Sequence, residues 1–553
     1  MVNTSELLPL PRILATDGQI IAEGSRVYEN DRYTVHWIGF VYDNSGASDQ
    51  DVVASLVNSL SMGIAIGDAA ATLRGTFFMS VEDRPEKVRY SFVDDSALFS
   101  AYWSNQAVST SFLWLCQSVG IGSNSFPLKT LVQMLHLGNI YFGETLSPDV
   151  KKLGADEIAV ESNSTVSITS KAVPALSDAP AFSSLEDASS PLADSVKGKS
   201  VSVDLTGGFD SRMLACLLYS HGVKFETALA GTPGTNDAVY GQQVAEALGV
   251  PYSYSVYDNS EIVNELDPLL ARMDGLCGTF LVVHRLLQLN ADRRHRGVDL
   301  SFKGSGGELY KDFFWTQDFP FYRSRNTKMS RLCGLRVEFE RLSEKVLTEQ
   351  ASEVYDQLLQ ERRQRLAERY TSQFNTQSYD KVYFYERVQT WNSRTISSSM
   401  DSCPVVHSPL AELQMAQVGY QTARTKRFYN RLHRETIANA SLKASQVLTT
   451  DGTSASSTVA GQMSDGVGYV RIKSKKLMKK LSQVFLNRTA FESKEYSPDE
   501  ELLLRIGETQ LAQDAFEALR EAELIRADVK FEEVPRRFKE SSLVLGWTLN
   551  HLR

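Results

Sequence analysis

The stretch KSVSVDLTGGFDSRMLACLLYSHGVKFETALAG, residues 199–231, decides the fold that the sequence predicts. A β-branched run from Val201 to Leu205 precedes the turn TGGFDS, and an apolar helical pattern then continues until it ends near Gly222. A second strand is expected from Phe225 to Ala230. A strand, a turn, a helix and a strand in this order predict a parallel β-α-β unit.

The turn has the composition of an anion-binding loop. Gly207 and Gly208 allow a tight turn whose backbone N–H groups point inward, and the following helix brings the positive end of its dipole to the same place. Thr206 and Ser211 add hydroxyl groups. The carboxylate of Asp210 would repel a bare phosphate, so its presence predicts a divalent cation between it and the phosphates.

The same alternation continues after the second strand. Asn236 or Asp237 can cap a helix that Gly249 ends, and residues 252–256 alternate in the manner of a third strand. We therefore expect an α/β fold with a parallel sheet, whose ligands bind at the carboxyl ends of its strands.

The loop TGGFDS resembles the SGG-x-DS pyrophosphate loop of the ATP pyrophosphatases, with threonine in the first hydroxyl position. It differs from the Walker loop G-x-x-x-x-G-K-[ST]: the GKS at residues 198–200 has Ala193 in place of the first glycine, and it comes before the strand and not between a strand and a helix. Within that superfamily the chain resembles the asparagine synthetase branch. The stretches that carry this resemblance are FKGSGGELYKDFFW (302–315), YERVQTWNSR (385–394), VVHSPLAEL (405–413) and TKRFYNRLHRETIANA (425–440).

The resemblance implies an adenine-nucleotide α-hydrolase-like synthetase domain over residues 199–553, with a helical C-terminal part, that uses ATP and Mg²⁺. It implies catalytic roles for Asp210 and Glu308 as the ligands of the metal ion, and Lys311, close to the second glycine-rich turn, is a further catalytic candidate. The residues that it implies for binding ATP or pyrophosphate are Leu205, Thr206, Gly207, Gly208, Asp210, Ser211, Ala230 and Gly306.

The first part of the chain resembles the glutaminase-type N-terminal domain of the same family. The stretches concerned are LRGTFFMSVED (73–83), VDDSALFSAYW (93–103) and FPLKTLVQMLHLG (126–138). The resemblance implies an αββα sandwich of the Ntn-hydrolase type over residues 1–172. Residues 173–198 are rich in Pro, Ala, Ser and Asp without a helical or strand period, which predicts an irregular linker.

The N-terminal domain departs from the family at its nucleophile. Glutaminase domains of this type use a cysteine exposed as the first residue after removal of Met, whereas position 2 is Val2 and the first cysteine is Cys116. β-Lactam synthetases and lasso-peptide cyclases share this feature, and in them an amine of a substrate attacks the activated acid. We therefore expect a degenerate domain that releases no ammonia from glutamine.

The second glycine-rich turn also departs from the family. Its acidic pair is replaced by Gly307 followed by Glu308, so one expected metal ligand is missing. Three readings remain open: Glu308 coordinates Mg²⁺ alone, Asp312 compensates for the missing carboxylate, or Glu308 only caps a helix.

The lysine that the family carries after its Arg-Glu helix has no clear counterpart. Lys443 comes too early and is expected at the surface, and Thr449 or Thr450 occupies the expected neighbourhood. Lys311, close to the second glycine-rich turn, is another candidate for contact with pyrophosphate.

The composition excludes several other classes of protein. The chain has 553 residues, 42% of them hydrophobic, and a net charge of −9, which is typical of a globular protein and unfavourable for binding nucleic acid or anionic lipid. Its 5 cysteines form no CxxC pair. No window approaches the roughly 18 consecutive apolar residues of a membrane span, and no leader is evident. We expect a cytoplasmic protein.

The expected activity is that of a ligase that adenylates a substrate carboxylate, releases pyrophosphate and passes the acyl group to an amine. The acid could be a small molecule, a sugar acid or a peptide, and the C-terminal FKESSLVLGWTLNHLR (538–553) resembles synthetase-like proteins of surface polysaccharide pathways. The sequence leaves open whether the protein forms a homodimer. Two alternatives are a catalytically impaired nucleotide-binding partner protein and a tRNA-modifying ATP pyrophosphatase, and the acidic balance disfavours the second.

Overall fold

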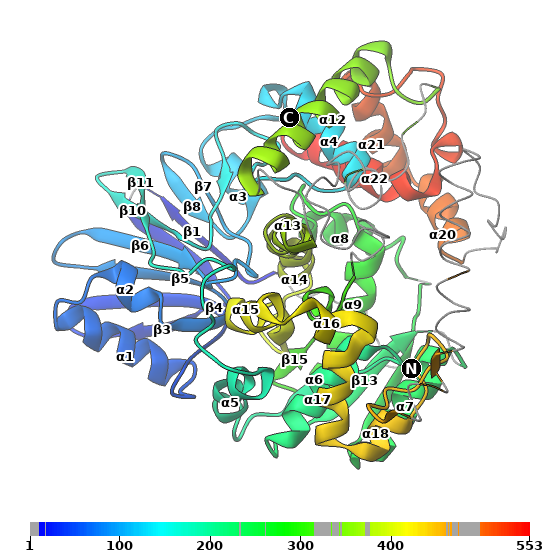
Figure 1. Cartoon of the computed structure of the whole chain (residues 1–553). Helices are drawn as coiled ribbons and strands as arrows, with labels where there is room; N and C mark the ends of the chain where they lie inside the picture. The colour runs from blue at the N-terminus through cyan, green and yellow to red at the C-terminus, as the bar shows by residue number, and fades with distance from the viewer. Residues whose placement is uncertain are drawn as a thin grey trace.

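The computed structural model describes residues 10–313 except 17, 232, 233 and 260; residues 333, 342, 345–370, 376–459, 463, 465, 466 and 474; and residues 498–553. In this part of the chain two antiparallel sheets lie near the N-terminus, and one parallel sheet follows them (Figure 1). Val2, Phe314 and Trp315 lie outside the described residues. Within the described residues, no helix is both long and apolar enough to cross a membrane.

The N-terminal region is built from the two antiparallel sheets. The first has the order β2-β1-β8-β7-β9, and its strands are β1 (Arg12–Thr16), β2 (Gln19–Glu23), β7 (Tyr102–Trp103), β8 (Ala107–Ser109) and β9 (Lys151–Lys152). The second has the order β11-β10-β6-β5-β4-β3, and its strands are β3 (Arg26–Glu29), β4 (Tyr33–Asp43), β5 (Leu73–Asp83), β6 (Val88–Val93), β10 (Glu157–Ser162) and β11 (Thr165–Ser170).

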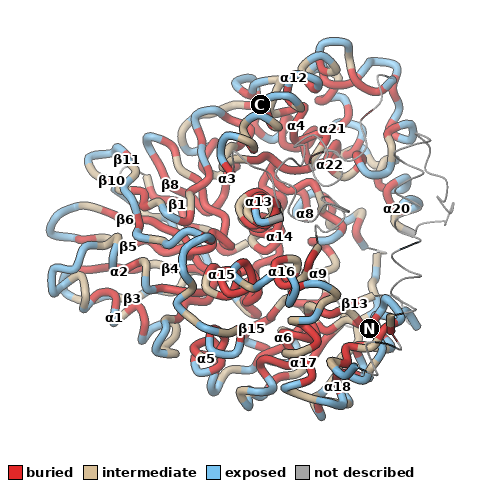
Figure 2. Tube along the Cα trace, viewed as in Figure 1, coloured by how far each residue is buried: buried red, intermediate tan, exposed pale blue. Residues whose placement is uncertain are grey.

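Alternation along the strands arranges these sheets and four helices in layers. On β4, Val35 and Trp37 belong to the core beneath α1 and α2, whereas Phe40 belongs to the core between the two sheets. On β1 of the other sheet, Ile13 faces that same central core, and Leu14 joins the core beneath α3 and α4. The covering helices are α1 (Gln50–Ser61), α2 (Ile66–Ala70), α3 (Phe112–Ser118) and α4 (Leu128–Leu137). The expected order of helix, sheet, sheet and helix layers is therefore present, and the buried positions in Figure 2 mark its interior.

The parallel sheet has the order β14-β13-β12-β15-β16, with every adjacent pair parallel. Its strands are β12 (Val201–Asp204), β13 (Glu226–Gly231), β14 (Tyr252–Val256), β15 (Leu300–Phe302) and β16 (Val405–His407). The crossover helices α6 (Phe209–Ser220) and α7 (Asn236–Leu248) confirm the β-α-β-α-β pattern predicted for residues 199–256. Because β12 is the central strand, the glycine-rich loop that follows it lies at the middle of the carboxyl edge of the sheet.

Helices make up most of the described chain after β15. A π-helix, η3 (Tyr383–Asn392), runs directly from α13 into α14. The helices and short turns not yet named are η1 (Ser123–Ser125), α8 (Leu266–Arg272), α9 (Phe280–His295), η2 (Gly307–Tyr310), α12 (Glu349–Tyr370), α13 (Thr376–Val382), α14 (Ser393–Ser398), η4 (Pro409–Ala411), α15 (Leu413–Gln421), α16 (Arg424–Arg427), η5 (Phe428–Asn430), α17 (Arg431–Ala440), α18 (Leu442–Gln446), α20 (Pro498–Gly507), α21 (Gln510–Glu521), η6 (Phe531–Glu533) and α22 (Arg536–His551).

The prediction of an irregular linker over residues 173–198 is wrong for its second half. Helix α5 (Leu185–Ser195) forms there, and the hydroxyl of Ser184 caps it by accepting from the N–H of Asp187. Leu185, Ala188 and Leu192 give it a buried face. Polar residues separate these apolar positions, so the short helical period is not recognisable in the sequence. Packing against the rest of the protein stabilises a helix that its composition does not favour.

A buried ion pair joins the N-terminal region to the parallel sheet. Arg74 on β5 donates to Glu412 Oε2 at 2.7 Å, and the hydroxyl of Tyr42 on β4 donates to the same oxygen at 2.6 Å. His407, at the end of β16, has its Nε2 3.1 Å from Glu412 Oε1 and its Nδ1 2.9 Å from Thr76 Oγ1. These side chains are almost completely buried, so β16 is fixed against β4 and β5.

Candidate functional site at the carboxyl edge of the parallel sheet

The loop after β12 is held in shape by its own side chains and by α7. The N–H of Thr206 donates to Ser211 Oγ at 3.1 Å, the two hydroxyl oxygens lie 3.0 Å apart, and the N–H of Gly208 donates to Thr206 Oγ1 at 3.1 Å. The N–H of Gly207 donates to Oδ1 of Asp237, in the first turn of α7, at 3.1 Å. The predicted loop therefore has a defined shape between two helix N-termini.

The N-terminus of α6 lies at this loop and has no side-chain cap. Gly208 is its cap residue. The free N–H groups of the first turn and the positive end of the dipole therefore face the carboxyl edge of the sheet. Leu205 and Ala230, at the ends of the neighbouring strands β12 and β13, are buried behind this edge.

The second glycine-rich turn packs directly against the first loop. A Cβ at Gly304 would lie 2.8 Å from the backbone N of Ser211, and Gly306 has φ +96 and closely approaches the carbonyl of Leu410. A Cβ at Gly307 would overlap the carboxyl group of Asp210. The glycines of this turn thus allow the two loops to touch, and Asp210 uses the space that a side chain at position 307 would need.

Asp210 receives two hydrogen bonds from basic side chains. Lys311 Nζ donates to Oδ2 at 2.7 Å, and His433 Nε2 lies 2.8 Å from Oδ1. A carboxylate oxygen only accepts, so His433 carries its hydrogen on Nε2. The Asp210 side chain is 25% exposed and that of Lys311 is 20% exposed, whereas His433 on α17 is fully buried. The structure therefore brings together two predicted site residues and one that the sequence analysis did not single out.

The side chains of Asp210, Lys311 and His433 shift one another's pKa values. Burial would raise the pKa of Asp210, but Lys311 and His433 outweigh burial and hold the pKa well below its usual value. Burial would lower the pKa of Lys311, but the charges of Asp210 and Glu308 raise it above the ordinary value. Burial lowers the pKa of His433 in spite of Asp210, so its imidazole is a neutral donor at neutral pH. Asp210 and Lys311 therefore form a pair of opposite charges at the start of α6.

Glu308 lies in the short turn η2 and points to the π-helix. The hydroxyl of Tyr383 donates to Glu308 Oε2, and burial together with this carboxylate raises the pKa of Tyr383 well above its usual value. Glu308 does not cap η2, because Gly306 is the cap residue and no side chain bonds to it there. Asp312 is also engaged, since Arg424 Nε donates to it at 3.1 Å. Of the three readings of this turn, the geometry contradicts helix capping by Glu308, and both Glu308 and Asp312 have a hydrogen-bond donor as partner.

Thr450 packs on the first loop, in the neighbourhood where the family carries a lysine. Its N–H donates to the carbonyl of Gly207 at 3.1 Å, and its methyl group lies 2.9 Å from where a Cβ on Gly207 would be. Arg212 fixes this arrangement by donating to the carbonyls of Val447 at 2.7 Å and Leu448 at 2.8 Å. Lys443 is exposed on α18, as predicted for a surface residue.

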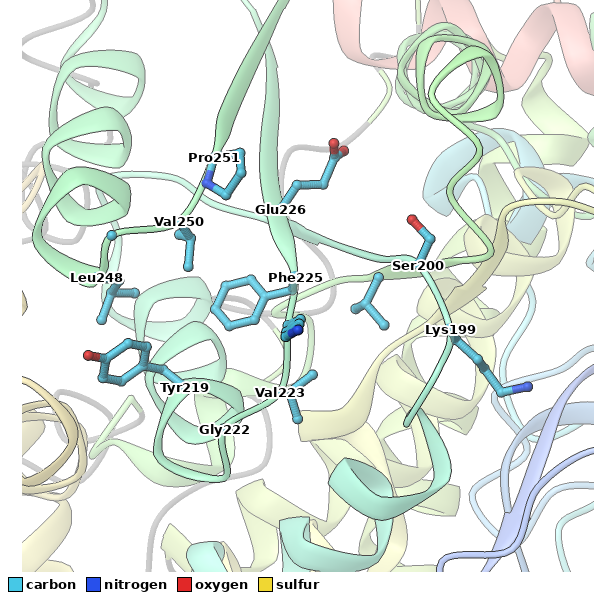
Figure 3. Close-up of a pocket in the computed structure, with 13 residues that line it drawn as sticks. Lys199, Ser200, Tyr219, Gly222, Val223, Phe225, Glu226, Leu248, Val250 and Pro251 are labelled. Carbon is cyan, nitrogen blue, oxygen red and sulfur yellow. The ribbon is translucent and has the colours of Figure 1, made fainter.

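A cavity of about 600 Å³ lies at the opposite, amino-terminal edge of the parallel sheet, and Figure 3 shows the residues that line it. Among its lining residues are those directly before β12, β13 and β14, which are Ser200, Phe225 and Pro251. Ligands of parallel α/β sheets bind beyond the carboxyl ends of the strands, so this cavity is not the nucleotide site.

The residues of the site fit a magnesium ion that arrives with a nucleotide. Mg²⁺ is commonly held by one or two carboxylates together with substrate phosphates. Asp210 contacts the ammonium group of Lys311, and the charge of Glu308 acts on the same lysine, so both carboxylates have a cation within their influence. Within the described residues, no cluster of three or more His, Cys, Asp or Glu side chains forms a metal site built from protein alone.

Comparison with known proteins assigns part of the chain to a family. A family model of asparagine synthase matches residues 189–448, which include the parallel sheet, both glycine-rich turns and α17. No curated protein matches the sequence. The asparagine synthase domain belongs to ATP-using ligases that form amide bonds, so the chain is an enzyme of that general kind. Residues 189–448 thus form a domain of the asparagine synthase family.

Proposed function

We propose that this protein adenylates a substrate carboxylate with ATP, releases pyrophosphate, and passes the acyl group to an amine without using glutamine. The observation that carries the proposal is the uncapped N-terminus of α6 at the carboxyl edge of the sheet, with the Asp210–Lys311 pair beside it. An uncapped helix terminus with a neighbouring ammonium group favours the binding of phosphate, and both can stabilise negative charge that develops on a leaving pyrophosphate.

Each residue of the proposed site has a task within that reaction. In the structure the hydroxyl of Thr206 accepts from the N–H of Gly208 and lies 3.0 Å from the hydroxyl of Ser211. On binding, these two hydroxyls and the N–H groups of Gly208 and Ser211 would turn from one another to the β- and γ-phosphates. Asp210 and Glu308 would hold Mg²⁺, which would neutralise charge on the phosphates. Lys311 would offset the charge of the departing pyrophosphate. Leu205, Ala230 and Gly306 would form the walls behind the nucleotide.

A cavity of about 370 Å³ between the N-terminal region and the π-helix supports a polar organic substrate. Glu386 and Gln389 of the π-helix, Trp103 of β7 and Arg369 of α12 are among its lining residues. The π-helix also carries Tyr383, the partner of Glu308, so it connects this cavity to the nucleotide site. Acidic, basic and aromatic groups in one cavity suit a carboxylated sugar or another small acid better than nucleic acid.

Glutamine is not expected to accelerate the reaction. Cys116, the first cysteine of the sequence, is buried in α3, and burial raises the pKa of its thiol to about 12, so it supplies no thiolate. Product formation with an amine present should be the same with and without glutamine, and no glutamate should appear by chromatography. Release of glutamate by the purified protein would contradict this part of the proposal.

The proposed reaction is tested by a screen for pyrophosphate release. The full chain is incubated with ATP, Mg²⁺ and pooled carboxylates and amines, and the products of active pools are identified by mass spectrometry. We expect AMP, pyrophosphate and an amide in equal amounts. ADP and phosphate in place of AMP and pyrophosphate would rule out adenylation.

A nucleotide-binding partner protein without catalysis is the second candidate. Two observations favour it: Gly307 supplies no carboxylate, and Thr450 lies against the first loop in the neighbourhood where the family has a lysine. Such a protein would bind ATP and leave it unchanged in every pool of the screen.

A further inference from the structure

The ammonium group of Lys311 lies at the N-terminus of α6. It is 2.7 Å from Asp210 Oδ2, and Asp210 belongs to the first turn of α6. Glu308, three residues before Lys311, adds a second negative charge that raises the pKa of the lysine. The charge of Lys311 thus offsets the negative charges of Asp210 and Glu308. One-fifth of the lysine side chain remains exposed, so a ligand can reach it.

Gly307 makes this arrangement possible. Any side chain at position 307 would overlap the carboxyl group of Asp210, so Asp210 could not keep its present position. The glycine at position 307 therefore has two consequences: it supplies no second carboxylate, and it leaves the space in which Asp210 lies against Lys311.

His433 fixes Asp210 from the other side. It is fully buried, with its ring centroid 6.1 Å from that of Phe209 and 6.3 Å from that of Tyr310, and its Nε2 is 2.8 Å from Asp210 Oδ1. A buried ring in van der Waals surroundings has little freedom to turn, so it holds the carboxylate in one orientation. His433 is a positioning residue, since it acts on the phosphate site through Asp210.

We propose that Lys311 is a built-in cation of this phosphate site and that the protein binds a nucleoside triphosphate without a metal ion. The inference rests on the proposed function, because it concerns the same loop, but it addresses binding and not turnover. A carboxylate beside a triphosphate repels it unless a cation stands between them. Here the protein supplies that cation itself, whereas a pair of carboxylates would require a metal ion for binding.

The test measures the binding of ATP by calorimetry, once in excess EDTA and once in excess Mg²⁺. The wild-type chain should bind ATP in both buffers with dissociation constants within about tenfold of each other, or about 1.4 kcal/mol. Lys311→Met should weaken binding in EDTA by at least about tenfold and should lose much less in Mg²⁺, because the metal ion then replaces the missing charge.

Three further variants control this experiment. Lys311→Arg keeps the positive charge and should bind ATP in EDTA, which also separates loss of charge from loss of folding. Lys443→Met removes an exposed lysine from α18 and should behave as the wild type. His433→Gln keeps an N–H donor toward Asp210 and should retain binding in EDTA better than His433→Leu, which has none. Equal binding by the two His433 variants would contradict its positioning role.

The outcomes separate this inference from the proposed function. Wild-type binding in Mg²⁺ that disappears in EDTA would overturn the built-in cation and leave the nucleotide site intact. Equal binding of ATP in EDTA by the wild type and by folded Lys311→Met would overturn it as well. Failure to bind ATP in either buffer would overturn the proposed function itself.

Discussion

Replacement of Asp210 by asparagine is expected to lower the rate of pyrophosphate release by ~10²–10³, with little change in folding. Asparagine has nearly the same shape, so it can still lie in the space over Gly307 and accept from His433. It lacks the charge that holds Lys311 at the start of α6, so the cation is no longer fixed where the negative charge develops. Initial rates are measured with the acid and amine that the pooled screen identifies.

Binding of ATP provides the internal control for this variant. The substitution removes a negative charge from the side of the phosphate site, and in excess Mg²⁺ the metal ion offsets the release of Lys311, so the affinity for ATP measured in Mg²⁺ should change by less than about tenfold while turnover is lost. Glu246→Gln removes an exposed carboxylate from α7 and should leave both quantities unchanged. A rate of pyrophosphate release equal to that of the wild type would refute the assignment of Asp210.

Replacement of Arg74 by methionine is expected to lower the free energy of unfolding by about 3–5 kcal/mol. The Arg74 and Glu412 side chains are 1% and 0% exposed, so loss of the arginine leaves a buried carboxylate without its main counter-charge. The pair joins β5 to the segment after β16, so the transition affected is the one that separates the N-terminal region from the parallel sheet. Urea unfolding followed by tryptophan fluorescence measures the loss.

A surface ion pair is the matched control for Arg74. Arg12 and Glu23 are paired at 3.2 Å with side chains 37% and 50% exposed, so Arg12→Met should cost less than about 1 kcal/mol. Similar losses for the two variants would show that the interior pair makes no special contribution to stability.

The same pair gives the stability a dependence on pH. Burial would raise the pKa of Glu412, but Arg74 and His407 outweigh burial and lower it from the ordinary 4.5 to about 2. A pKa that is lower in the folded state than in the unfolded state stabilises the fold above the unfolded value, and the contribution is lost as the pH falls from about 4.5 toward 2. The Arg74→Met variant should lose less stability than the wild type over that interval.

The local parts of the fold were predictable from the sequence. The strand before TGGFDS, the helix after it and the next two strands are set by alternation, by helical period and by glycine, all of which act between near neighbours. Helix α5 was missed because its period is short and interrupted by polar residues, and its burial depends on distant elements. Propensity decides little in such a segment, since tertiary packing supplies the stability.

The site was predictable where a motif carries it, and not where long-range contacts do. Asp210 and Lys311 were expected near pyrophosphate, and the structure places them in contact, while their catalytic roles remain predictions. His433 lies 223 positions from Asp210, inside a stretch that was noted only for its Arg-Glu pair. The contact of Tyr383 with Glu308 also joins residues far apart in the sequence, and it depends on the packing of a π-helix that no local sequence pattern predicts.

The central claim is that the turn from Thr206 to Ser211 binds the phosphates of ATP. A crystal structure with α,β-methylene ATP, which cannot be split between its first two phosphorus atoms, tests it most directly. We expect the β- and γ-phosphates within hydrogen-bond distance of the N–H groups of Gly208 and Ser211, with Lys311 turned toward them. A nucleotide bound elsewhere, with this turn in contact only with its own side chains and Thr450, would contradict the account.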